Sequence, residues 1–288
     1  MEHPQLHIHH PEASHTHTAI LLHGRGSDGP EFAEELFSST TSRDKTLTAC
    51  LHGWRWVFPT AADRWSTTFQ EELCAWFDAY SLGDIQEKQE LQADGIKESA
   101  TYILGILETE IALLGGKHTH VYLGGISQGM ATAIWTFLGA VAIGRIQGPL
   151  GGVLGFCGWF PFAQQLEDLF QKSELSGGAG SPQMQRLLSR FFIDTLSHKT
   201  PQPSQPPDIS VMSTPVFLSH GTDDDWVSVE LGRQASRVLR QALLHVEWNE
   251  FTGAEGDGHW IKEPEGFDQI LHFLERPPRK NIIPSHGN

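Results

Sequence analysis

A serine in a glycine-rich turn is the first residue of this sequence that could carry chemistry. The segment Gly125-Ile126-Ser127-Gln128-Gly129 matches the pattern G-x-S-x-G and separates the apolar run HVYLG from the apolar run MATAIW. A serine on a sharp turn between a strand and a helix projects above the sheet and can act as a nucleophile. A plain glycine-rich turn is the alternative, but the position between a predicted strand and a predicted helix favours the nucleophile.

A hydroxyl is a weak nucleophile unless a base takes its proton and an acid orients that base. His259 lies downstream in the segment GDGHW, in a glycine-bearing loop before the last predicted helix. Other downstream histidines fit less well, because they fall in a proline-rich segment, at strand ends or in a helix: His198, His220, His245 and His272. His259 is therefore the candidate general base, and a polar loop residue is the alternative.

The candidates for the acid are three consecutive aspartates, Asp223, Asp224 and Asp225, which follow the apolar run PVFL. In hydrolases with a serine turn of this kind, the acid comes between serine and histidine in chain order. Side-chain alternation directs Asp224 away from its two neighbours. Asp225 could instead cap the following helix, Asp223 could be solvated, and Asp257 is a further candidate.

Acyl transfer also needs two backbone N–H groups that bind the negative charge on the carbonyl oxygen. Gln128, directly after the serine, is expected to supply one. The loop HGRGSDG is expected to supply the other, because Gly24, Gly26 and Gly29 allow the backbone to turn its amides inward. Arg25 is the donor by position. The loop is not a phosphate-binding P-loop, since no G-K-[ST] follows.

Apolar runs alternate with segments of helical periodicity along most of the chain. Strands are expected at 18–23, at 54–61 with a stop at Pro59, and at 120–125, 150–158, 214–221 and 245–251. Helices are expected at 30–37, 92–116, 130–144, 228–244 and 263–275. This order predicts an α/β fold with a mainly parallel central sheet and helices on both faces. Ligands of such sheets bind beyond the carboxyl ends of the strands, where the candidate residues lie.

One segment, from about 164 to 213, interrupts the alternation. It contains SGGAGSP and SHKTPQPSQPPD, and between them residues 183–196 are predicted to form an amphipathic helix. We expect a single α/β domain over residues 1–288, in which this insertion forms a lid or part of an acyl pocket at the rim of the site. The proline-rich tail, about 277–288, is expected to be loose.

Composition excludes several other classes of protein. The net charge of −15 disfavours nucleic acid and anionic membrane surfaces as partners. Three widely spaced cysteines without a CxxC argue against a disulfide framework and a structural zinc site. The seven histidines among the first 23 residues lack a regular ligand spacing, so an exposed strand or arm is expected there and no metal. No signal peptide or membrane span is recognised, which predicts a cytoplasmic protein.

The motifs LLHGRGSDG, VFPTA, WFD, GGISQG, HGTDDDWV and GHW occur together in a familiar order. In this respect the chain resembles the phospholipase/carboxylesterase family, which includes acyl-protein thioesterases and small bacterial carboxylesterases, from about Ala19 to Leu274. The resemblance implies an α/β-hydrolase fold and a cofactor-free serine hydrolase of acyl esters or thioesters, sometimes a homodimer. The family pattern HG-x-x-D-x-x-V places Asp224 at the acid.

Some residues depart from that family's pattern. Arg25 stands where acyl-protein thioesterases usually have leucine, and it could bind an anionic group of the substrate or point to solvent. Trp76, Trp159, Trp226 and Trp260 fall in motif loops and are expected to line an aromatic pocket, or else to belong to the core. These departures leave an alternative function, namely a pathway-specific biosynthetic enzyme (a lyase, cyclase or dedicated hydrolase) on the same scaffold.

Overall fold

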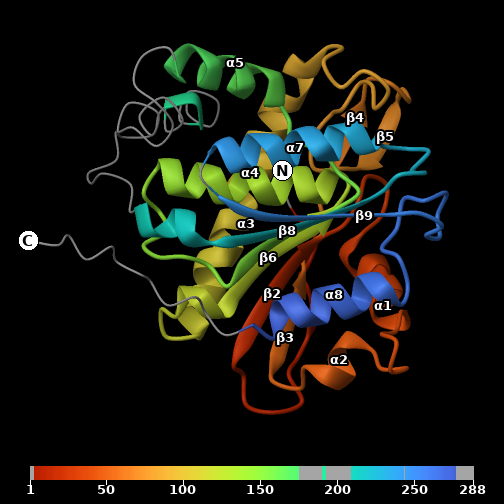
Figure 1. The fold of residues 1–288 in the computed structure, drawn as a ribbon, viewed down its shortest axis with the longest axis vertical. Coiled ribbons are helices and arrows are strands. Elements are labelled where there is room, and N and C mark those ends of the chain that lie inside the picture. The colour runs from red at the N-terminus through yellow and green to blue at the C-terminus, as the bar shows by residue number, and fades with distance from the viewer. Residues whose placement is uncertain (1–2, 175–189, 193–208, 243, 277–288) are drawn as a thin grey trace, which may run out of the picture.

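The central feature of the computed structural model is a seven-stranded sheet. Residues 3–174, 190–192, 209–242 and 244–276 are described. The strand order is β1-β3-β2-β6-β7-β8-β9, and every neighbouring pair is parallel except β1 and β3 (Figure 1). The strands are β1 (His7–His9), β2 (His17–Leu22), β3 (Trp54–Phe58), β6 (Val121–Ile126), β7 (Gly152–Phe156), β8 (Pro215–Gly221) and β9 (His245–Phe251).

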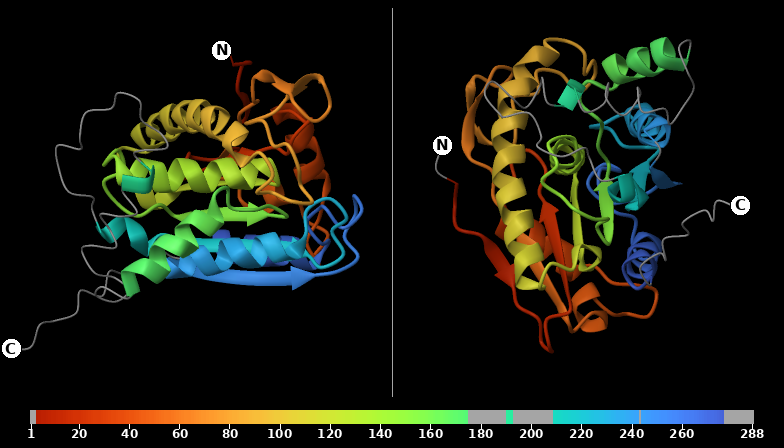
Figure 2. Two further views of the ribbon diagram at one scale, coloured as in Figure 1. Left: turned by 90° about the horizontal axis from the view of Figure 1, so that it is seen from above. Right: turned by 90° about the vertical axis from the view of Figure 1, so that its left-hand side faces the viewer.

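Helices cover both faces of this sheet, as the two further views show (Figure 2). One face carries α1 (Gly29–Ser38), α2 (Leu47–Cys50) and α8 (Glu265–Leu274), and the other carries α3 (Gln92–Leu113), α4 (Gln128–Ala142), α5 (Ala163–Glu174) and α7 (Val229–Gln241). Side chains of β2 alternate between the two apolar clusters: Ala19 and Leu21 enter one, Ile20 and Leu22 the other. The predicted α/β class with a mainly parallel sheet is therefore confirmed.

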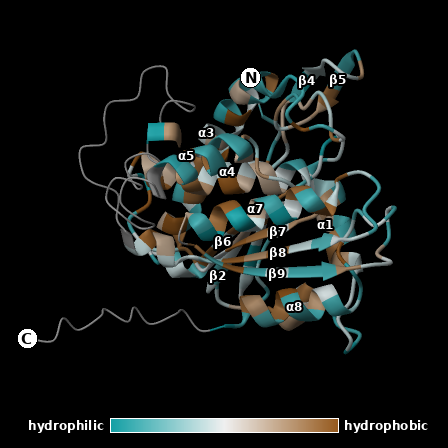
Figure 3. Ribbon diagram, turned by 45° about the horizontal axis from the view of Figure 1, so that its top comes forward, coloured by the Kyte–Doolittle hydropathy of each residue, from teal (hydrophilic) through white to brown (hydrophobic). Residues whose placement is uncertain are grey.

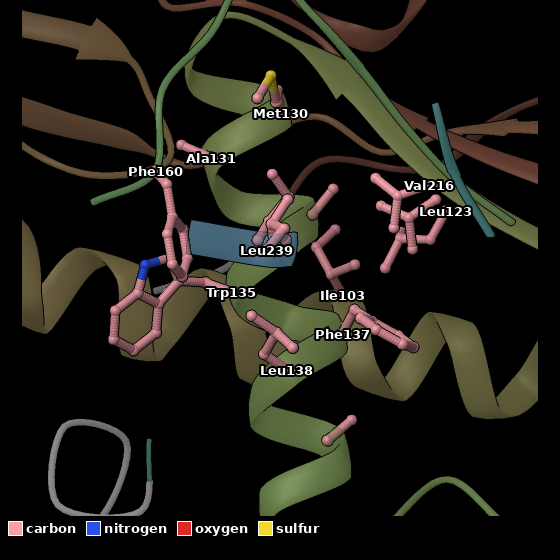
Figure 4. Packing of buried hydrophobic residues seen from close by; sticks show 14 of the residues in the cluster. Ile103, Leu123, Met130, Ala131, Trp135, Phe137, Leu138, Phe160, Val216 and Leu239 are labelled. Carbon is pink, nitrogen blue, oxygen red and sulfur yellow. The ribbon is translucent and has the colours of Figure 1, made fainter. Parts of the chain in front are cut away.

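Helix α4, which starts directly after Ser127, is buried at every residue. Trp135 of α4 packs on Phe160, and apolar residues of α3, α7 and the neighbouring strands surround the helix (Figure 4). Figure 3 shows how apolar residues gather between the layers while polar ones face outward on α7. The candidate nucleophile Ser127 is the N-cap of this buried helix, which fixes the position of its backbone.

Several smaller elements were not expected from the sequence. A two-stranded hairpin, β4 (Asp63–Ser66) with β5 (Glu71–Cys74), stands apart from the main sheet. Short 3₁₀ turns occur at Gln89–Leu91, His118–His120 and Ile209–Ser213. His7 and His9 lie in β1, which pairs with β3 at the edge of the sheet; a strand here was one of the two expected alternatives for this segment. In the described part of the chain, no helix is both long and apolar enough to cross a bilayer.

The predicted insertion is described only in part. Helix α5 lies at its start and contacts α7, where Gln234 donates to Glu167 at 2.9 Å. Most of the predicted helix at 183–196 and the tail at 277–288 lie outside the described residues. The expectation that Asp225 caps α7 is wrong, because Ser228 occupies the N-cap and accepts the N–H of Glu230.

Candidate active site

The turn between β6 and α4 holds Ser127 in a conformation that non-glycine residues rarely adopt. Its φ and ψ are 56° and −121°, a strained combination that is often found at functional sites. Gly125 and Gly129 make the turn possible: a Cβ on Gly125 would lie 2.6 Å from the Leu22 carbonyl oxygen, and one on Gly129 would overlap that same oxygen. Strand β6 and helix α4 therefore approach each other closely, and Ser127 lies just beyond the carboxyl end of β6.

The histidine and one aspartate that were predicted from the sequence are hydrogen-bonded. His259 Nδ1 lies 2.8 Å from Asp224 Oδ2, and the Asp224 side chain is completely buried. A carboxylate only accepts, so Nδ1 carries the proton and Nε2 is free to act as a base. Ser127 and His259 line the same cavity.

Asp224 receives more hydrogen bonds than the one from His259. Its Oδ1 accepts the backbone N–H groups of Trp226 at 2.9 Å and Val227 at 2.8 Å, and His220 Nε2 lies 3.2 Å from Oδ2. Burial would raise the pKa of Asp224, but the hydrogen bonds from His220, His259 and Val227 outweigh it and hold this pKa well below its usual range. Asp224 is therefore a stable anion beside His259.

The other candidate acids lie elsewhere. Asp223 accepts the Gly253 N–H at 2.8 Å and the Thr252 hydroxyl at 2.9 Å, so it holds the turn after β9 in place. Asp225 and Asp257 are exposed, and their contact is a backbone hydrogen bond of 3.0 Å. Asp224 alone of the four contacts His259 through its side chain in the described structure.

The loop after β2 lies next to the serine turn. A Cβ built on Gly24 would be 3.5 Å from Ser127 Cβ, so the backbone of this loop borders the nucleophile. His23 braces the loop: its Nδ1 lies 2.6 Å from the Gly24 carbonyl oxygen, and its Nε2 accepts the Ala61 N–H at 3.0 Å. Burial lowers the pKa of His23 to about 4. The sequence interpretation did not assign a role to His23.

Gln128 connects the serine turn to a second loop through its side chain. Its Oε1 accepts the Trp76 N–H and its Nε2 donates to the Phe77 carbonyl, both at 2.7 Å. Trp76 Nε1 in turn donates to the His23 carbonyl oxygen at 2.9 Å. The Gln128 backbone N–H, at the first position of α4, has no partner within the helix. These bonds fix the two loops relative to each other.

A cavity of about 620 Å³ opens above Ser127. Trp159, Trp226 and Trp260 line it, as expected from the sequence, but Trp76 does not. Trp76 is completely buried because it packs against the loop after β2, with its ring 4.9 Å from that of His23. The unexpected hairpin contributes further walls, including Phe69 and Leu73.

The Arg25 side chain lies in this cavity and not in bulk solvent. Its guanidinium is 4.8 Å from the centre of the Phe69 ring and donates to the Ala79 carbonyl oxygen at 3.3 Å. Burial lowers the pKa of Arg25, and Asp78 opposes this shift. Three acidic residues also line the cavity, namely Glu35, Glu71 and Glu255. The cavity is therefore apolar in part and charged at its walls.

One group of possible metal ligands occurs among the described residues: Cys157, Asp224 and His259, whose ligand atoms lie within 4.8 Å of one another. The Asp224 and His259 atoms are already hydrogen-bonded to each other. Burial raises the pKa of the Cys157 thiol to about 12, so the thiolate that metals prefer is disfavoured. The arrangement fits a hydrogen-bonded acid and base better than a metal centre.

Several known proteins are similar to this chain over most of its length. Acyl-protein thioesterase 1 of Gibberella zeae is 27% identical over 275 residues, covering 93% of this chain and 95% of that protein. A probable carboxylesterase, SOBER1-like, of Arabidopsis thaliana is 26% identical and covers 89% of this chain and 75% of that protein. Among solved structures, Zea mays acyl-protein thioesterase 2 has the same fold, with a TM-score of 0.63, 23% identity and coverage of 94% and 97% of the two chains.

A family comparison covers more than half of the sequence. Residues 3–176 match the family described as Phospholipase/Carboxylesterase, a span that includes the loop after β2 and the serine turn. The chain therefore belongs to the phospholipase/carboxylesterase family of hydrolases.

Proposed function

We propose that this protein hydrolyses carboxylic esters or thioesters through Ser127, His259 and Asp224. The observation that carries the proposal is the 2.8 Å bond between His259 Nδ1 and Asp224 Oδ2, beside a cavity that Ser127 also lines. The bond fixes the tautomer in which Nε2 can take the serine proton. Family membership supports the same reaction class.

In the proposed reaction Ser127 attacks the acyl carbonyl while His259 takes its proton. The backbone N–H groups of Gln128 and Arg25 bind the oxyanion, and Asp224 stabilises the imidazolium that forms. His259 then protonates the leaving alcohol or thiol, which leaves an acyl group on Ser127. Water activated by His259 attacks this acyl-enzyme, and the acid is released with the proton returned to Ser127.

Labelling with a fluorophosphonate probe tests the assignment of the nucleophile. Wild-type protein should be labelled and should hydrolyse a p-nitrophenyl ester, whereas Ser127→Ala should do neither. Ser38→Ala is a matched control, because Ser38 lines the same cavity but bonds to the Glu35 carbonyl oxygen and should leave labelling intact. Full ester turnover by Ser127→Ala would refute the proposal.

A second candidate is a dedicated enzyme for one polar metabolite, and the charged cavity wall favours it. Arg25 is held in the cavity by Phe69 and Ala79, and several of its N–H groups are available to a substrate. A series of acyl esters of increasing chain length separates the two candidates. A smooth preference for chain length supports a general esterase, while labelling of Ser127 with near-zero rates on every ester supports the dedicated enzyme.

A further inference from the structure

A second histidine, which does not line the cavity, contacts the candidate acid. His220 is completely buried in β8, and its Nε2 lies 2.8 Å from the Val227 carbonyl oxygen and 3.2 Å from Asp224 Oδ2. The same Asp224 oxygen bonds to His259 Nδ1. One carboxylate oxygen therefore lies between two imidazole rings, one facing the cavity and one facing the core.

The surroundings of His220 determine which of its nitrogens carries the proton. A carbonyl oxygen only accepts, so the nitrogen that contacts the Val227 carbonyl must be the donor. Nδ1 has no hydrogen-bond partner in the described structure and faces Gly232 of α7, where a Cβ would lie 2.5 Å away. The Nε2–H therefore donates to the Val227 carbonyl oxygen, and core packing keeps the same nitrogen 3.2 Å from Asp224 Oδ2.

We propose that His220 is a positioning residue for the hydrolysis reaction, acting through Asp224. Its Nε2 lies against Oδ2 while the Trp226 and Val227 N–H groups bond to Oδ1, so His220 helps to restrict rotation of the carboxylate and to keep the geometry of the His259 contact. The inference rests on the proposed function, in which Asp224 orients His259. Other ionisable groups near this pair are Cys157, whose thiol is hydrogen-bonded to the Asp224 carboxylate, and the two acids Asp223 and Glu250.

Two polar substitutions of different reach test this role. A glutamine amide extends about as far as the imidazole Nε2, whereas an asparagine amide reaches only the position of Nδ1. His220→Gln should keep kcat within about threefold of wild type, and His220→Asn should lower it by about 10- to 100-fold, as is usual when an orienting partner is removed. In His220→Asn, Asp224 loses this contact and presents more negative charge to His259. The acidic limb of the kcat–pH profile should therefore shift by about half a unit to higher pH.

A measurement that does not need turnover keeps this test separate from the proposed function. The low-field proton resonance of His259 Nδ1–H, assigned with His259→Gln, should be sharp in wild type and His220→Gln and should broaden in His220→Asn. If wild type neither hydrolyses esters nor reacts with fluorophosphonate, the proposed function fails, and this resonance still decides the role of His220. An unchanged resonance together with an unchanged pH profile in His220→Asn would overturn the inference.

A variant on another element covers the case in which His220→Asn does not fold. Gly232→Ala places a methyl group against His220 Nδ1 and the Trp248 ring, which are the nearest side chains to the new Cβ. It should broaden the same resonance, whereas Gly105→Ala, with no atom within 4 Å of the new Cβ, should not. Equal spectra for these two alanine variants would count against the inference.

Discussion

Three adjacent aspartates with the same chemistry have three different environments. Asp223 holds a turn through Gly253, Asp224 is buried against His259, and Asp225 is exposed. The difference arises because the chain leaves β8 at this point and successive side chains point in different directions. At the scale of single residues, only Asp224 of the three is placed where a change of charge would act directly on His259.

Substitution of single aspartates by asparagine should therefore separate them. Asp224→Asn should lower kcat by up to about four orders of magnitude, because the amide can favour the wrong histidine tautomer. Asp223→Asn should retain most activity, since the amide oxygen can still accept the Gly253 N–H. Steady-state kinetics on one p-nitrophenyl ester measures both. Loss of activity in Asp223→Asn with retention in Asp224→Asn would mean that Asp223 is the acid.

The sequence allowed Ser127 and His259 to be proposed because each lies in a short, recognisable turn. Asp224 required comparison with a family pattern, since local chemistry could not separate it from its neighbours. His23 and His220 were not assigned, because their contacts depend on the fold: the partner of His23 is distant in the chain, and Asp224 and Val227 approach His220 only in the folded turn after β8. His23, for example, accepts from Ala61, 38 residues later. Such buried polar contacts cannot be inferred from local spacing.

At the scale of elements, the six parallel strands were predicted from their apolar residues, which form continuous runs in β6 and β7 and alternate with polar residues in β9. The hairpin was missed because β4 and β5 have four residues each and are largely polar, as in DRWS and EELC. Its apolar residues, Trp65 and Phe69, are about half exposed and give no periodic signal. The aromatic wall of the cavity was therefore only partly predicted, and Trp76 was assigned to it wrongly.

The close contact between β2 and α4 predicts opposite effects for two glycine-to-alanine changes in helices. Gly129→Ala should destabilise the protein by about 2–3 kcal/mol, because the methyl group would overlap the Leu22 carbonyl oxygen. Gly105→Ala, on the exposed side of α3 with open space around it, should stabilise by about 0.5–1 kcal/mol. Urea denaturation measures both. Similar urea midpoints for the two variants would show that the turn between β6 and α4 is not tightly constrained.

At the scale of the whole molecule, the parallel sheet gathers the candidate residues from distant parts of the chain. The strands β2, β6, β8 and β9 all end at one edge, so their following loops meet there (Figure 1). Polar groups are buried behind this edge, including His23 and His220. Burial of an ionisable group links the stability of the entire fold to pH.

His23 predicts the direction of that pH dependence. Its pKa is about 4 in the folded protein against 6.5 for the free side chain, so the unfolded chain binds more protons between these values. The contribution of neutral His23 to the free energy of unfolding should be fully present above about pH 6.5. The free energy of unfolding should then fall by up to about 3 kcal/mol as the pH approaches 4. His23→Asn loses the Ala61 contact and should be less stable at pH 7, but the gap to wild type should narrow at pH 4.5. Urea denaturation at both pH values tests this prediction. His245 is exposed, so His245→Gln is a control that should follow wild type. An equal difference in stability between His23→Asn and wild type at both pH values would contradict the prediction.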